Sequence, residues 1–243
     1  MPSPLYRMLA VALPMAIWPM AQAVAESNVL SIVQDGGENR LTVDQSQASN
    51  SQVGGLEIGA PTLQTFTLTP NAETSQSEDT LPEQVRLNVL SAERMRGQPA
   101  RQMGGGNSAD IKISGNGGFV GLLQSSPSPN LGNQANVNLA GGGRALIGQL
   151  GGGNKATAML GAGALEGTIL QKGDSNVADL SVTGKGSSGS ISQYGSGLNN
   201  SLAVSGAGTS AALISNGVSN GTAGTPITVQ SNGASVTITQ SKM

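Results

Sequence analysis

Residues 147–182 read IGQLGGGNKATAMLGAGALEGTILQKGDSNVADLSV and contain one short pattern twice, 22 residues apart. In both copies a Gln follows an apolar residue by two positions, a Gly follows the Gln by two, and an Asn follows the Gln by five: Gln149-Gly151-Asn154 and Gln171-Gly173-Asn176. After each Asn, small and aliphatic residues occupy every second position. Such alternation is typical of a β-strand with one buried face, and Gly supplies the left-handed backbone that tight turns need. Each copy therefore predicts a strand, a turn, a second strand and a second turn.

The pattern recurs along the chain at a nearly constant spacing. The Gln position is filled by Gln102, Gln124, Gln149, Gln171, Gln193, Ser215 and Gln240, with steps of 22, 25, 22, 22, 22 and 25 residues. One further copy lies apart from these, at Gln34 and Asn39. A fixed period of this length is the sequence signature of stacked structural repeats. We therefore predict an all-β fold, a β-solenoid of stacked two-strand repeats of about 22 residues with an irregular N-terminal region.

Period-two placement puts the Gln and Asn of each repeat on the same face as its apolar residues, so we expect these amides to point inward. A buried amide without a partner costs about 1–3 kcal/mol, but in a stack each side chain can donate to the next and accept from the previous one. In the copy that begins at Gln193 the Asn is expected to be slightly displaced. The expected structural ladder comprises Gln34, Asn39, Gln102, Asn107, Gln124, Asn133, Gln149, Asn154, Gln171, Asn176, Gln193, Asn200, Ser215, Asn220 and Gln240.

The composition argues against several classes of function. The 243 residues include no His and no Cys, which removes His and Cys metal ligands and the Cys/His and Ser/His catalytic pairs. A net charge of -2 offers no basic surface for nucleic acid. The Gly-rich turns lack the Lys-Ser/Thr of a phosphate-binding loop, and Asp recurs at no common repeat position, as a calcium-binding β-roll requires. We expect no catalytic residue, cofactor, metal or small-molecule substrate.

The first residues have the layout of a secretory signal peptide. Arg7 precedes a short apolar run over residues 8–18, and the small-residue pattern Ala21-Gln22-Ala23-Val24-Ala25 follows it. The run is shorter than the about 20 residues of a membrane-spanning helix, and Pro14 and Pro19 argue against an uncleaved anchor. We predict cleavage after Ala23 or Ala25 and export of the mature chain.

The repeat Gln-x-Gly-x-x-Asn-x-Ala resembles that of the curlins, the subunits of curli, which are functional amyloid fibres of bacterial surfaces and biofilm matrix. The resemblance covers residues 100–243 and a separate copy at 28–45, and it is closest at Gln102-Met103-Gly104-Gly105-Gly106-Asn107 and Gln193-Tyr194-Gly195. It implies a β-solenoid with two short strands per coil, export through a dedicated outer-membrane pore, and polymerisation by stacking of chain ends. Other curlin subunits are implied as partners.

One feature departs from the curlin pattern. Curlin repeats often carry a second Gln six residues after the Asn, and here only Gln45 does, while Ile113, Leu160 and Val182 fill that position in other copies. Aliphatic packing thus replaces one polar ladder. The departure leaves open whether the chain is a major, a minor or a nucleating subunit.

The expected organisation has four parts. Residues 1–25 are a signal peptide, 26–45 an isolated curlin-like repeat, 46–99 a polar and partly flexible insert, and 100–243 the curlin-repeat solenoid. Short alternations at 65–69 and 85–89 could form strands within the insert, which could also hold a contact with the secretion pore or a partner.

These features favour a secreted, extracellular structural subunit of curli-like fibres, with a role in cell adhesion and biofilm and growth by cross-β stacking. The end of the chain repeats the apolar-x-Gln register at Ile238 and Gln240, which is expected to leave an open strand edge. The alternative is a monomeric secreted β-solenoid adhesin or surface-binding protein. An ice binder would need the outward pair Thr237 and Thr239 on every coil, and a polysaccharide-cleaving solenoid would need clustered Asp, Lys or Arg; neither pattern occurs.

Overall fold

The computed structural model describes residues 28–55, 62–63, 85–86, 98–127, 130–218, 227–230 and 233–241. Over these residues the chain forms strands and turns without a helix, and so without a helix able to cross a membrane. The strands are β1 Val29–Leu30, β2 Ile32–Asp35, β3 Arg40–Ser49, β4 Gln52–Gly55, β5 Thr62–Leu63, β6 Val85–Arg86, β7 Ala100–Gly104, β8 Ser108–Asn116, β9 Phe119–Ser126, β10 Gln134–Ala140, β11 Arg144–Leu150, β12 Lys155–Leu160, β13 Glu166–Lys172, β14 Val177–Asp179, β15 Ser188–Ser196, β16 Asn199–Ser205, β17 Ser210–Val218, β18 Ile227–Gln230 and β19 Ser235–Ser241.

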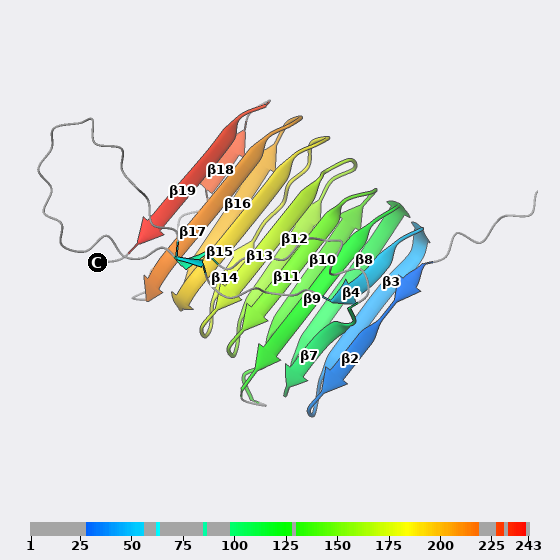
Figure 1. The fold of residues 1–243 in the computed structure, drawn as a ribbon, viewed down its shortest axis with the longest axis vertical. Helices are drawn as coiled ribbons and strands as arrows, with labels where there is room; N and C mark the ends of the chain where they lie inside the picture. The colour runs from blue at the N-terminus through cyan, green and yellow to red at the C-terminus, as the bar shows by residue number, and fades with distance from the viewer. Residues whose placement is uncertain are drawn as a thin grey trace, which may run out of the picture.

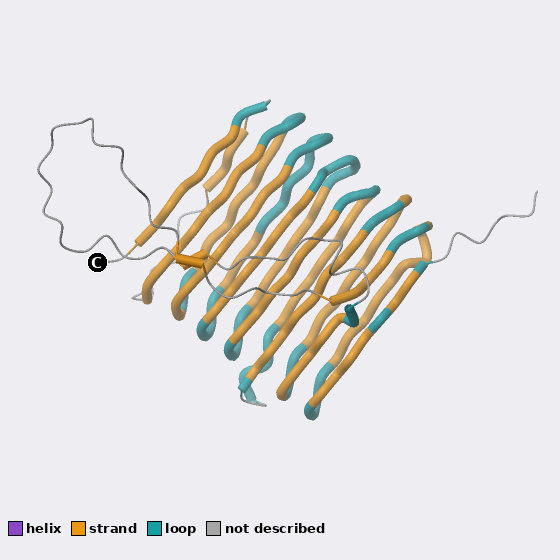
Figure 2. Tube along the Cα trace, in the orientation of Figure 1, coloured by secondary structure: helices purple, strands orange, loops and turns teal. Residues whose placement is uncertain are grey.

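The strands build a parallel β-solenoid of about seven turns, which confirms the predicted fold class. One sheet has ten strands, with β1, β4, β9, β11, β13, β15, β17 and β19 in order and with β2 and β7 beside them. The other has seven strands, in the order β18, β16, β14, β12, β10, β8 and β3. Figure 1 shows the coils stacked in chain order from blue to red, and Figure 2 shows the turns that join the two layers at their edges. Strands β5 and β6 form a separate antiparallel pair.

Equivalent residues of successive coils pair with one another. In the ten-stranded sheet Gln149 pairs with Gln124 on one side and with Gln171 on the other. Apolar side chains pack between the two sheets in the same way, so the core is a set of short aliphatic columns. Its fully buried members include Leu122, Ile147, Ile169, Ile191 and Leu213 on one sheet and Ile111, Val137 and Leu202 on the other, with Leu180 directly after β14.

The N-terminal copy of the repeat stacks directly on the main array. Gln34 pairs with Gln102 across β2 and β7, although 68 residues separate them, and β3 pairs with β8. Strands β4 and β7 share one neighbour, since Gly55 pairs with Leu122 of β9 and Arg101 pairs with Leu123 of the same strand. The chain between β4 and β7 therefore interrupts a single strand of the second coil.

Strand pairing continues past residue 45, where we expected the repeat to give way to the insert. A bulge between Asp44 and Gln47 shifts the register of β3 and hides the alternation that a sequence pattern needs. Gln45, the single second Gln, lies at this bulge, and its Nε2 is buried without a partner among the described residues. Hydrogen bonds from the Ser46 hydroxyl and backbone N–H lower the pKa of the neighbouring Asp44.

The Gly of each repeat is required by the stacking of the turns. Gly151, Gly173 and Gly195 have φ of +114°, +110° and +142°, which L side chains rarely adopt. A Cβ at Gly173 would also collide with the carbonyl oxygen of Gly195 in the next coil. Both the backbone conformation and the close approach of the next coil therefore require Gly at this position.

Replacing Gly173 with Ala should destabilise the solenoid by about 2 kcal/mol or more, because the new methyl group displaces a stacked backbone. The matched control is Gly37→Ala, since Gly37 lies in the equivalent region of the first coil and a Cβ there meets no atom within 4 Å. The control should change stability by about 0.5 kcal/mol or less. Urea unfolding followed by circular dichroism measures both, and equal midpoints would contradict the assignment.

Candidate functional site

The Gln residues of the repeats form a continuous column inside the solenoid. Gln102, Gln124, Gln149, Gln171 and Gln193 are completely buried. Nε2 of each Gln from Gln34 to Gln171 donates to the Oε1 of the Gln in the next coil. The N–O distances are 2.6 Å from Gln34 to Gln102, 2.7 Å from Gln102 to Gln124, 2.8 Å from Gln124 to Gln149, 2.9 Å from Gln149 to Gln171 and 2.8 Å from Gln171 to Gln193.

Each of the five buried Gln residues also donates its second N–H across the core to the opposite sheet. The acceptor is the backbone carbonyl of the residue that follows the Asn position: Gln124 donates to Ser108 at 3.1 Å and Gln171 donates to Lys155 at 3.0 Å. Gln102, Gln149 and Gln193 make the same contact with Arg40, Gln134 and Val177. One neutral side chain thus joins two coils and two sheets, and a neutral donor with partners can be buried without a large desolvation penalty.

A second column is formed by Asn39, Asn107, Asn133, Asn154 and Asn176. The Oδ1 of each of the first four accepts the backbone N–H of the Asn in the next coil, as from Asn154 to Asn133 at 3.1 Å and from Asn176 to Asn154 at 3.0 Å. Nδ2 of Asn107, Asn133 and Asn154 donates to the same oxygen of the previous coil. Asn133 keeps its place although the chain from Gln124 is four residues longer than in the other coils.

The prediction that Asn200 belongs to this Asn column is wrong. The backbone N–H of Leu198 donates to Asn176 Oδ1 at 2.9 Å, so Leu198 fills the Asn position of that coil. Asn200 pairs instead with Ala178, in the column of small residues. The physical reason is that the hydrogen-bonded turn keeps its length of five residues after Gln193 and tolerates a changed side chain, whereas a displaced Asn would break the register.

Asn200 has a different partner, which the repeat pattern alone did not reveal. Its Nδ2 donates to Ser215 Oγ at 2.8 Å, at the point where Ser replaces the ladder Gln. Asn200 is almost completely buried and occupies space beside the shorter Ser side chain. The sequence does carry a signal for this pair, because Asn200 replaces the Ala of the repeat and Ser215 replaces the Gln in the next coil.

The Gln-to-Gln bonds end at Gln193, whose Nε2 donates to the backbone carbonyls of Val177 and Leu198. Ser215 Oγ donates to Gln240 Oε1 at 3.1 Å, and Gln240 is exposed. At the other end Gln34 is also exposed and Asn39 is half-buried. Asn220 lies outside the described residues.

Apart from the two amide columns, the described residues form few features that could bind a ligand. Within the described ranges no three acidic side chains gather in a way that could hold a metal ion. A groove of about 340 Å³ lies over the glycine-rich turns and is lined by Gly117, Phe119, Arg144, Leu165 and neighbouring small residues. Arg144 is the one charged side chain in that lining.

Replacing Gln171 with Glu should destabilise the protein by about 3 kcal/mol at pH 7, because a carboxylate would face Gln193 Oε1 and the Lys155 carbonyl without a donor. Burial and these acceptors raise the pKa of the introduced carboxyl, so the folded state binds the proton more tightly than the unfolded state. Stability relative to the parent chain should therefore recover as the pH falls below that raised pKa.

The matched control is Gln134→Glu, which makes the same change at an exposed, outward-facing position of β10. Urea unfolding at pH 7 and pH 4 separates the two variants. A Gln171→Glu protein as stable as Gln134→Glu at pH 7 would show that the amide column is not needed for stability.

The comparison with protein families finds one match within this ladder. Residues 164–195 match the family model described as Curlin associated repeat. The matched span holds β13 and β14 and most of β15, with Gln171, Asn176 and Gln193 in the contacts given above. Searches of the curated proteins and of the solved structures give no match. The segment 164–195 is therefore similar to the curlin associated repeat, and it is one unit of the stack in which Gln171 and Gln193 are ladder partners.

Proposed function

We propose that this chain is a secreted subunit of curli-like extracellular fibres, which grow when one solenoid stacks on another. The curlin repeat and the β-solenoid point to a curli-type structural protein rather than an enzyme. Secretion, fibre growth and a role in adhesion and biofilm matrix belong to the proposal. So do its partners: further copies of the chain, other curlin subunits and an outer-membrane secretion pore. A major, a minor and a nucleating role are all compatible with it.

The observation that carries the proposal is the polarity of the Gln ladder. In all five Gln-to-Gln bonds, from Gln34 to Gln193, Nε2 donates toward the C-terminal end. Gln34 uses its Nε2 within the chain, so its Oε1 faces the N-terminal end as an acceptor. Gln240 accepts from Ser215, so its Nε2 is available as a donor at the other end. A Gln240 of one copy can therefore donate to Gln34 of the next copy in the same geometry as inside the solenoid.

Exposed apolar side chains at the N-terminal end support the same contact. Leu30 and Ile32 point inward by register, yet they are 49% and 38% exposed because no described coil lies beyond them. At the C-terminal end Val236 and Ile238 are half-buried in β19, the last strand of the same sheet. Stacking two copies would remove these side chains from water. Because the joined ends differ, such stacking repeats without closing and produces an open filament.

Purified mature chain should form fibres with a meridional reflection near 4.7 Å, the spacing of hydrogen-bonded strands. Ile32→Asp should slow fibre growth about tenfold or more, because it places a charge in the stacking contact. The control is Val33→Asp, which lies next to it on β2 and points outward. Fibre diffraction and growth curves test both. A monodisperse monomer at high concentration would instead favour the monomeric surface-binding protein.

The mature protein should begin at Val24 or Glu26 and occur outside the cell. This segment lies outside the described residues, and the prediction rests on the A-x-A pattern. Ala23 belongs to both possible cleavage sites, so Ala23→Asp should block processing, whereas Gln22→Asp between the small residues should not. Mass spectrometry of the secreted fraction gives the N-terminus. An intact segment from Met1 to Trp18 in that fraction would contradict the prediction.

A further inference from the structure

Part of the outer face of the ten-stranded sheet is apolar and buried. Leu146, Leu170 and Ile214 point away from the core, since their neighbours Ile147, Ile169 and Leu213 point into it. Nevertheless they are only 2%, 2% and 5% exposed. None of the three belongs to the core cluster between the sheets. Their burial therefore requires a cover on the outside of this sheet.

The outer face of the seven-stranded sheet behaves differently. Asn136 and Asn138 of β10 and Asp110 and Lys112 of β8 are outward and exposed. Met159, the large apolar residue on the same face of β12, is 52% exposed. One side of the solenoid thus has the polar, accessible surface expected of a soluble sheet, whereas the other carries a buried apolar patch.

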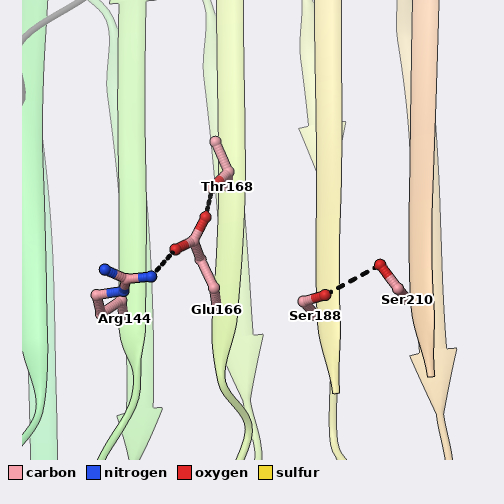
Figure 3. A network of polar contacts seen from close by, with 5 residues as sticks. All are labelled: Arg144, Glu166, Thr168, Ser188 and Ser210. Atoms are coloured by element: carbon pink, nitrogen blue, oxygen red, sulfur yellow. Dashed lines mark hydrogen bonds and ion pairs between the residues drawn. The ribbon is translucent and has the colours of Figure 1, made fainter. Parts of the chain in front are cut away.

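Polar contacts mark the rim of the buried face. Arg144 Nη2 lies 2.6 Å from Glu166 Oε2, and Thr168 Oγ1 donates to Glu166 Oε1 at 3.1 Å (Figure 3). Arg144 and Glu166 remain 39% and 30% exposed, whereas Thr168, further along β13, is buried. The solvent exposure of outward side chains therefore falls along β13, from Glu166 at its start to Leu170.

The two described ends of the insert, Gly55 and Gln98, lie side by side, since Gly55 N donates to Gln98 O at 2.5 Å. Strand β4 is paired with β1 on one side and with β9 on the other, and its inward side is core, so only its outward side is open. A Cβ at Gly121 would lie 3.1 Å from both Gly55 O and a methyl of Leu146, which places Gly55 next to the buried face.

The sequence of the insert fits an apolar surface. Phe66 and Leu68 alternate with Thr, and Val85, Leu87 and Val89 alternate with Arg and Asn. Alternation of this kind gives a strand one apolar side. The backbones of β5 and β6, at 62–63 and 85–86, already pair as an antiparallel ladder within this segment.

We propose that residues 56–97 pack their apolar side against the outer face of the ten-stranded sheet, over Leu146, Leu170 and Ile214. The insert then acts as a built-in partner for that face and closes it to a second solenoid, which could otherwise pack on it sheet to sheet. This inference concerns the side of the solenoid and does not rest on the proposed stacking of its ends.

Cysteine labelling tests the proposal directly, because the chain has no Cys of its own. In the full chain, the Cys of Leu170→Cys should react with a maleimide at least tenfold more slowly than that of Met159→Cys, the exposed control on the opposite face. A second variant removes residues 55–99 and joins Gly54 to Ala100, which restores one continuous strand beside β9. In that background the Cys at position 170 should react about as fast as the control.

Two full-length variants keep the test independent of the deletion. Phe66→Ser with Leu68→Ser, and Leu87→Ser with Val89→Ser, should each raise the reactivity at position 170 and leave β-sheet circular dichroism unchanged. Protection that survives the deletion and both double variants would mean that something else covers the face, such as a second copy. Rapid labelling in the unaltered full chain would mean that the face is open. Either result overturns the proposal.

Discussion

The solenoid depends on a side-chain amide that is satisfied in two directions at once. A buried Gln donates one N–H along the stack and the other across the core, and it accepts from the coil before it. Neither Glu, Lys nor an aliphatic residue can do this, because each lacks either the donors or the acceptor. The amide therefore fixes both the spacing between coils and the distance between sheets. The aliphatic columns add hydrophobic burial, but they do not by themselves select one register.

Other constraints follow from this one. If every Gln must lie over the next, the turns after them must stack as well, and the backbone of one turn then touches the backbone of the next. Extra residues can enter only where they leave the ladder undisturbed. The chain inserts them after Gln124 before it regains the column at Asn133, and between Gly55 and Gln98, which hydrogen-bond to each other. Both additions preserve the pairing of the strands around them.

The repeat pattern was sufficient to predict the fold class, because the period of 22 residues and the alternation report the same geometry. It was not sufficient at positions where the backbone keeps its register and the side chain changes. Leu198 holds the Asn position through its N–H, and a main-chain donor leaves no mark in the sequence. The bulge after Asp44 hid the remainder of β3 for the opposite reason, since the alternation changed while the pairing continued. The burial of Leu170, on the outward side of β13, has no signature within the repeat.

The interrupted strand also sets an order for folding. Ladder partners along the main array are 22 or 25 residues apart, whereas Gln34 and Gln102 are separated by 68. The longer loop adds about 1 kcal/mol of closure entropy to the first junction. A chain that emerges with its N-terminus first must also hold its first coil unpaired until the second is complete. The first coil in sequence is therefore among the last to form, and the nucleus of folding lies in the uninterrupted coils that follow it.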